Sequence, residues 1–463
     1  MKRNLALILT LAIGGCTMGP DYQPPAAPVP AHWSLTAAAQ PQGREWWQAF
    51  DDPQIAALVV RALAANPDLA AAEAAVRAAR ALAAKTTGGT WPELDLSTAA
   101  SRSRDPASQG STTAAAKPRI ANSMTSGFDA SWEVDLWGKL ERGVQAATAT
   151  AQASQAEADG VRLTLIGDVL RAYVEVRGMQ LRLGVAEQAT AAYADTVTLT
   201  EAKFRAGTGS GLDLVRAQAQ LDASRAELPP LRATLRARLH ALSILTGQMP
   251  EALAVVLETP APVPRMTARP GLGVPADLVR KRPDLRQMER NLAAASAAIG
   301  VAEADLYPSL SLSGSIGLSS ATAGSLLELA SRTWSFGPSL VLPLLDGGSR
   351  RAEIAYRRAK AEQAEQLWRS AVLGALAEVE DALSAWDQQV LRQQALVAAV
   401  ATSRSALDLA SELNAKGMSS YLDVLDAQRE LHDLEAQVAE AQVAVITDLI
   451  SLYKALGGGA PLS

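Results

Sequence analysis

Four stretches of this 463-residue chain alternate between apolar and polar residues, a pattern that predicts β-strands. They cover residues 93–102, 123–136, 309–319 and 333–344. The apolar positions of each stretch share one face: Leu94 and Leu96; Phe128, Ala130, Trp132, Val134 and Leu136; Leu310, Leu312, Ile316 and Leu318; Trp334, Phe336, Leu340, Leu342 and Leu344. The opposite faces carry mainly serine, glycine and acidic residues. This alternation fits either a half-buried strand of a soluble sheet or a strand with one face in lipid and the other in water.

After each pair of strands the apolar spacing changes to that of long helices. Six apolar residues step alternately by four and three, which is a coiled-coil heptad pattern: Val372, Leu376, Val379, Leu383, Trp386 and Val390. We predict long helices over 138–205, 211–245, 347–415 and 420–456, and the first would be roughly 100 Å long if continuous. Pro229 and Pro230 are expected to break the second of these helices.

The body of the chain is duplicated. "NPDLAAAEAAVRAARALAAKTTGGTWPELDLS" from Asn66 aligns with "RPDLRQMERNLAAASAAIGVAEADLYPSLSLS" from Arg282, and "AGTGSGLDLVRAQ" from Ala206 aligns with "KGMSSYLDVLDAQ" from Lys416. Each copy reads helix, two strands, long helix, tight turn and helix. The repeat is too long for a solenoid unit, so we divide the body into two structural repeats, 46–260 and 261–463.

The N-terminus has the features of a lipoprotein signal. Lys2 and Arg3 precede an apolar run, and Ile13-Gly14-Gly15 leads to Cys16, the only cysteine. A lone thiol cannot form an intramolecular disulfide, so we expect residues 1–15 to be removed and Cys16 to carry lipid. The common inner-membrane retention signal has an aspartate directly after the lipidated cysteine, whereas this chain has Thr17 there. This difference favours sorting to the outer membrane. Residues 16–45 are proline-rich and are expected to form an extended arm.

Composition limits how such a chain could cross a membrane. Aromatic residues make up 4% and hydrophobic residues 48%, while the net charge of −5 gives no reason to expect a nucleic-acid surface. Beyond the signal, no apolar segment is long enough for a spanning helix, so a membrane-crossing role falls to the strands. Four strands cannot close a barrel, and open edges are not tolerated in lipid. Three copies would supply twelve strands, above the bacterial minimum of about eight.

Several motifs resemble the TolC/OprM outer-membrane factors, and especially their NodT-like lipoprotein branch. They run from the lipoprotein cysteine almost to the C-terminus: "GCTMGPDYQPP", "WWQAFDDPQIAALVVRALAANPDL", "WEVDLWGKLERG", "WSFGPSLVLPLLDGGSRR" and "GMSSYLDVLDAQREL". The resemblance implies a mixed α and β membrane protein. A homotrimer would share a twelve-stranded outer-membrane β-barrel, continued by a periplasmic α-helical coiled-coil barrel.

The same resemblance implies a passive exit duct without a catalytic site. Its partners would be a periplasmic adaptor and an inner-membrane transporter, for which the RND type is our expectation, and no nucleic acid. A type I secretion channel and a non-conducting periplasmic scaffold lipoprotein remain as alternatives. No cofactor is expected beyond the lipid on Cys16, and no metal, because His32, His240 and His432 are scattered without a cluster of ligands.

The turns between paired long helices are the remaining candidate sites. Gly207 and Gly417 each follow a long helix, where a left-handed cap is expected, and Asp423 falls in the first turn of the next. By resemblance, the periplasmic gate would involve Leu422, Asp423 and Asp426. Our own hypothesis adds an ion pair between Arg216 and Asp426 on neighbouring helices, which would latch the closed state. Asp423 has a counterpart in Asp213, so a structural capping role is an equal alternative for it. The resemblance assigns adaptor contact to the tips: Arg205, Gly207, Thr208, Lys416, Gly417 and Met418.

Overall fold

A computed structural model describes residues 17–27, 29–34, 45–105, 119–266 and 275–458. Its helices are α2 (Pro53–Ala65), α3 (Pro67–Gly88), α4 (Lys139–Arg205), α5 (Gly211–Leu245), α6 (Pro275–Lys281), α7 (Pro283–Ala304), α8 (Ser349–Ala415) and α9 (Tyr421–Ala455). Its strands are β1 (Glu93–Asp105), β2 (Arg119–Val134), β3 (Ser309–Ser320) and β4 (Arg332–Val341). The short 3-10 helices are η1 (Trp46–Ala49) and η2 (Leu329–Ser331). Cys16 and the signal lie outside the described residues.

The chain forms two compact units that cut across the sequence repeats. The first holds residues up to 25, 75–154 and 287–368, and the second holds 26–74, 155–286 and 369–463. Each unit therefore takes segments from both repeats.

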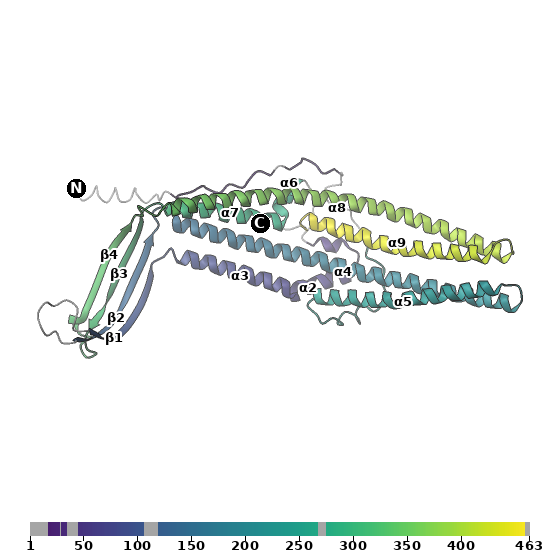
Figure 1. The fold of residues 1–463 in the computed structure, drawn as a ribbon, viewed down its shortest axis with the longest axis horizontal. Coiled ribbons are helices and arrows are strands. Elements are labelled where there is room, and N and C mark those ends of the chain that lie inside the picture. Colours follow the sequence, from purple (N-terminus) through teal and green to yellow (C-terminus); the bar gives the residue numbers. More distant parts are fainter. Residues whose placement is uncertain (1–16, 28, 35–44, 106–118, 267–274, 459–463) are drawn as a thin grey trace. The chain divides into compact units, whose positions relative to one another are not determined.

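The first unit contains one antiparallel sheet with the order β1-β2-β3-β4 (Figure 1). β2 pairs with β3, so the strands of the two repeats meet in the middle of the sheet. Trp137, just after β2, stacks on Tyr307 with ring centroids 4.8 Å apart and donates a hydrogen bond to the Pro308 carbonyl oxygen. These contacts fix the start of α4 against the end of α7.

Three of the predicted strands differ from the structure at their ends by several residues. The alternation predicts strands that end at Leu136 and Leu344, but β2 ends at Val134 and β4 at Val341. Pro343 has no N–H to donate to a ladder. After β2, Gly138 adopts a φ of 74°, which turns the chain into α4. Conversely, β1 continues to Asp105 and β2 begins at Arg119, beyond the apolar alternation.

The second unit is built on helices that pack in long antiparallel pairs (Figure 1). α4 and α5 are joined by one tip turn, and α8 and α9 by another. Near these turns, Tyr193, Leu221 and Leu425 form a buried cluster that joins α4, α5 and α9.

The break predicted at Pro229–Pro230 is wrong, because α5 runs continuously through both prolines. Contacts to α4 on each side of the prolines hold α5 in line. Ser224 and Thr190 hydroxyls lie 2.6 Å apart before them, and Arg232 pairs with Glu187 at 2.9 Å after them.

No single described helix is long and apolar enough to cross a membrane. Taken together, α2 and α3 satisfy the length and hydropathy criteria across a 46° bend between them.

Candidate channel wall and periplasmic tips

The sheet has one apolar and one polar face, as the alternation predicted. The pairing register aligns Leu96, Phe128, Ile316 and Trp334 in one row across all four strands. Their exposed fractions are 66%, 48%, 66% and 79%, so the row is not covered by any part of the chain that the structure describes. A bare apolar face of this kind indicates contact with lipid or with another protein.

The opposite face is polar at the same level of the sheet. Asp95, Asp129, Ser315 and Ser335 form the neighbouring row. Ser97 donates a hydrogen bond to Asp129 at 2.8 Å, and the Ser315 and Ser335 hydroxyls lie 2.9 Å apart. Hydroxyls and carboxylates of this kind are suited to a water-filled space.

Both edges of the sheet are open within the described residues. β1 pairs only with β2, and β4 pairs only with β3. An open edge presents unpaired backbone N–H and C=O groups, which lipid cannot satisfy. Lipid contact on the apolar face therefore requires strands from other copies of the chain at both edges.

The two tip turns have the same geometry, confirming the predicted left-handed glycines. Gly207 and Gly417 have φ values of 73° and 72°. In the first turn the Thr208 N–H reaches the Lys203 carbonyl and the Gly207 N–H reaches that of Phe204. Met418 and Gly417 repeat this pattern with Leu413 and Asn414. Both are Schellman motifs, which satisfy the last carbonyls of α4 and α8.

The predicted adaptor-contacting residues all lie at these turns. Lys203 donates a 3.0 Å hydrogen bond to the Asn414 side chain, which links the two turns of one chain. Arg205 pairs with Glu201, and Lys416 pairs with Glu412, within their own helices. Met418 is 63% exposed, so its side chain is available to another molecule.

The predicted gate residues lie in the first turns of α9 and have different surroundings. Asp423 forms a capping box with Ser420, whose hydroxyl accepts from the Asp423 N–H while the carboxylate accepts from the Ser420 N–H. This gives Asp423 a structural role. Leu422 is 40% exposed. Asp426 lies 3.9 Å from Arg429 on the same helix.

Within the described part of one chain, Arg216 forms no ion pair with Asp426, which instead lies near Arg429 of its own helix. The contact between α5 and α9 at this level is a hydrogen bond that Arg429 donates to the Gln220 side chain. A latch inside the protomer is therefore absent from this conformation. A latch between protomers stays a prediction.

A buried network of hydrogen bonds, which we call the relay, connects one face of α4 to segments that flank the helices. Arg177 is 5% exposed and donates to the Tyr173 hydroxyl at 3.0 Å and to the Thr259 carbonyl at 2.9 Å. Tyr173 in turn donates to Asp52 at 2.6 Å. Burial, together with the Asp52 hydrogen bond, raises the pKa of Tyr173 to about 12, so its hydroxyl remains a donor. No motif in the sequence indicates this relay.

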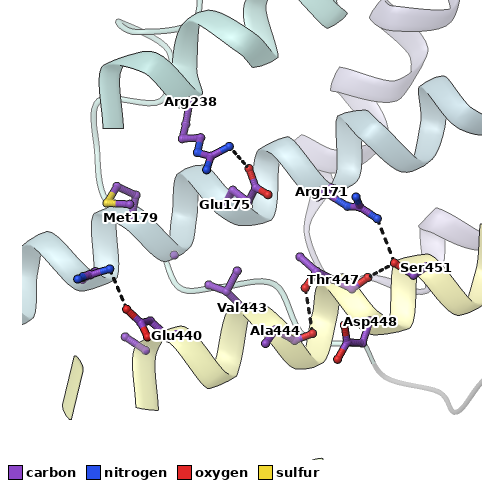
Figure 2. A pocket seen from close by; sticks show the side chains of 13 residues that line it. Arg171, Glu175, Met179, Arg238, Glu440, Val443, Ala444, Thr447, Asp448 and Ser451 are labelled. Atoms are coloured by element: carbon purple, nitrogen blue, oxygen red, sulfur yellow. Dashed lines mark hydrogen bonds and ion pairs between the residues drawn. The ribbon is translucent and has the colours of Figure 1, made fainter. Parts of the chain in front are cut away.

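The opposite side of α4 borders a recess of about 500 Å³ shared with α5 and α9 (Figure 2). Charged side chains link the three helices across it. Arg238 of α5 pairs with Glu175 of α4 at 2.8 Å, and Arg182 of α4 pairs with Glu440 of α9 at 2.8 Å. Arg171 of α4 donates to the Ser451 hydroxyl of α9 at 3.0 Å. No motif in the sequence indicates this recess.

The family model for outer membrane efflux proteins matches residues 58–248 and 274–458, most of the chain. This chain belongs to the outer membrane efflux protein family. It is 34% identical to nodulation protein T of Rhizobium leguminosarum bv. trifolii, covering 93% of this chain and 92% of that protein. It is 31% identical to the solvent efflux pump outer membrane protein SrpC of Pseudomonas putida, over 99% of this chain and 98% of that one.

The structure of the outer-membrane channel OprN is similar along nearly the whole chain. The TM-score is 0.88 at 34% identity, covering 96% of this chain and 99% of OprN. This outer membrane efflux protein therefore has the fold of the trimeric TolC-like channels, with a β-domain and a helical barrel. It is an outer-membrane efflux duct, and the open edges of its sheet are the sites where neighbouring copies complete the barrel.

Proposed function

We propose that a homotrimer of this chain is the exit duct of a tripartite efflux system. It passively conducts small molecules delivered by an RND-type inner-membrane transporter through a periplasmic adaptor. One observation carries this proposal: a sheet with a bare apolar face and two open edges is continuous in the chain with two 67-residue helices. The name of the relative SrpC, a solvent efflux pump protein, supports small solutes over secreted proteins.

The N-terminal arm and the tip turns take separate roles in this proposal. Lipid on Cys16 anchors the N-terminal arm in the outer membrane. In the periplasm, the adaptor contacts the tip turns at Arg205, Gly207, Thr208, Lys416, Gly417 and Met418. Exposed Met418 supplies apolar contact, and Lys416 and Arg205 supply charge.

Reconstitution tests the duct directly. Purified full-length protein is expected to run as an oligomer on unheated denaturing gels and to produce stepwise ionic currents in planar lipid bilayers. Lipid-facing strands closed into a barrel leave a water-filled pore, which is the physical reason for the current. A monomer without currents would instead support the scaffold alternative.

Within the duct, Leu422 and Asp426 are the proposed gate, with Leu422 providing apolar closure and Asp426 a ring of negative charge. Asp423 stays with its capping role. Replacing Leu422 and Asp426 together by Ala is expected to raise single-channel conductance about threefold or more and to reduce cation preference, because a fixed charge ring concentrates cations.

Asp408→Ala with Leu409→Ala is a matched control for the gate, because these exposed residues of α8 are of the same types. Conductance and ion preference of the control should equal the wild type. If the gate variant also matches the wild type, Leu422 and Asp426 do not form the constriction.

A further inference from the structure

α4 and α9 pack antiparallel, each with one face covered by flanking segments of the chain. On α4, Tyr173 and Arg177 bind the segments that contain Asp52 and Thr259. On α9, Tyr453 stacks on Trp46 with ring centroids 4.6 Å apart. In a tube of helices, these segments would block the passage if they lay inside, so the covered faces are the outer faces.

The opposite faces of the same helices border two recesses that share a lining residue, and we call the two recesses together the groove. The α4 residues Gly160, Thr164, Arg171, Glu175, Gly178 and Arg182 recur at helical spacing. They line two recesses, of about 500 and about 410 Å³, which share Ser451 as a common lining residue. The groove therefore faces the passage of the proposed duct.

Most charges in the two recesses are paired with one another. Arg238 pairs with Glu175, and Arg182 pairs with Glu440. Arg282 binds both Asp284, at 2.7 Å, and Glu378, at 2.6 Å. Although burial opposes ionisation of Asp284, the hydrogen bond from Arg282 holds the pKa of that carboxyl below its usual value.

Two cations of the groove have no carboxylate partner within ion-pair distance among the described residues: Arg171 and Lys454. Arg171 donates to Ser451, one turn of α9 before Lys454. The Lys454 side chain lies over Gly167: a Cβ added at Gly167 would be 3.7 Å from the Cδ of Lys454. Gly167 is one turn of α4 before Arg171, so both cations flank Ser451 where the recesses join.

Asp448 is the remaining carboxylate of the groove. Its side chain points away from the contact between Arg171 and Ser451 (Figure 2). Burial raises the pKa of this carboxyl, and the charge of Arg171 acts against that rise.

We infer that Arg171 and Lys454, which flank Ser451, form a binding site on the duct wall for the headgroup of an amphiphilic anion, a carboxylate or sulfonate. The Ser451 hydroxyl accepts from Arg171 and donates to the Thr447 carbonyl at 2.9 Å, so the two cations supply the donors to the headgroup. Apolar residues line the recesses on either side of this point, Met179 and Val443 in one and Leu163 and Ala382 in the other, and face the apolar part of the solute. The inference rests on the proposed function, because that function places the groove in the path of solutes.

Calorimetric titration of the purified full-length oligomer with naphthalenesulfonate tests the site without requiring conduction. Arg171→Gln with Lys454→Gln should weaken binding about tenfold or more, because two charge-assisted contacts are lost. Arg171→Glu with Lys454→Glu should reverse the preference, so that naphthylmethylammonium binds more tightly than the sulfonate.

Arg236→Gln with Arg392→Gln removes the same charge from exposed positions outside both recesses and should leave the affinity within about twofold of wild type. Equal affinity in the control and the Arg171/Lys454 variant would overturn the inference, as would absence of binding to the wild type. Both outcomes are separate from failure of the proposed function, which is read from wild-type currents in bilayers.

Discussion

Replacing Gly178 by Leu is expected to lower the free energy of unfolding by about 3 kcal/mol or more, the upper part of the range for overpacked contacts. A Cβ added at Gly178 would lie 2.0 Å from Val443 Cγ2, far inside contact distance. Val443 cannot move aside easily, because a β-branched side chain in a helix is held to one main rotamer. α4 and α9 would have to separate at the groove. Thermal unfolding followed by circular dichroism would measure the loss.

Gly184 provides a matched control on the same helix. A Cβ added there meets nothing within 4 Å, so Gly184→Leu avoids the overlap and gains helix propensity of about 0.8 kcal/mol. Gly178→Leu combined with Val443→Ala should recover part of the lost stability. If the Gly178 and Gly184 variants unfold at the same temperature, close packing of α4 on α9 does not stabilise the protein.

Local signals in the sequence were sufficient to predict the four strands and the four long helices, apart from the ends of some strands. Alternation identified the apolar face of each strand, because side chains of a strand alternate between faces whatever the strand pairs with. The pairing register then places Leu96, Phe128, Ile316 and Trp334 in one row. The start of a helix can also be predicted from local sequence. Asn66 precedes Pro67, and asparagine followed by proline is typical of a cap and the first helical residue. In the structure the Asn66 side chain accepts hydrogen bonds from the Asp68 and Leu69 N–H groups.

Features that depend on distant contacts were missed or wrong. Pro229 and Pro230 predict a break from local rules alone, whereas the contacts of α5 with α4 keep it continuous. The groove depends on an antiparallel register that brings Arg171 next to Ser451, 280 positions later in the chain. Because nothing local to either residue specifies that register, the site appears only in the folded structure.

The covered face of α4 gives a second large effect: Arg177→Met is expected to cost about 3–5 kcal/mol of stability, because it leaves buried acceptors without their donor. The side chain of Gln180 and the Thr259 carbonyl each accept from Arg177, at 2.8 and 2.9 Å. Methionine fills similar volume but donates nothing. The segment that contains Thr259 should detach first and become sensitive to limited proteolysis before the helices unfold.

Arg236→Met, at an exposed position of α5, should change stability by less than about 0.5 kcal/mol. Equal protease resistance in both variants would mean that the relay does not hold the flanking segments on α4.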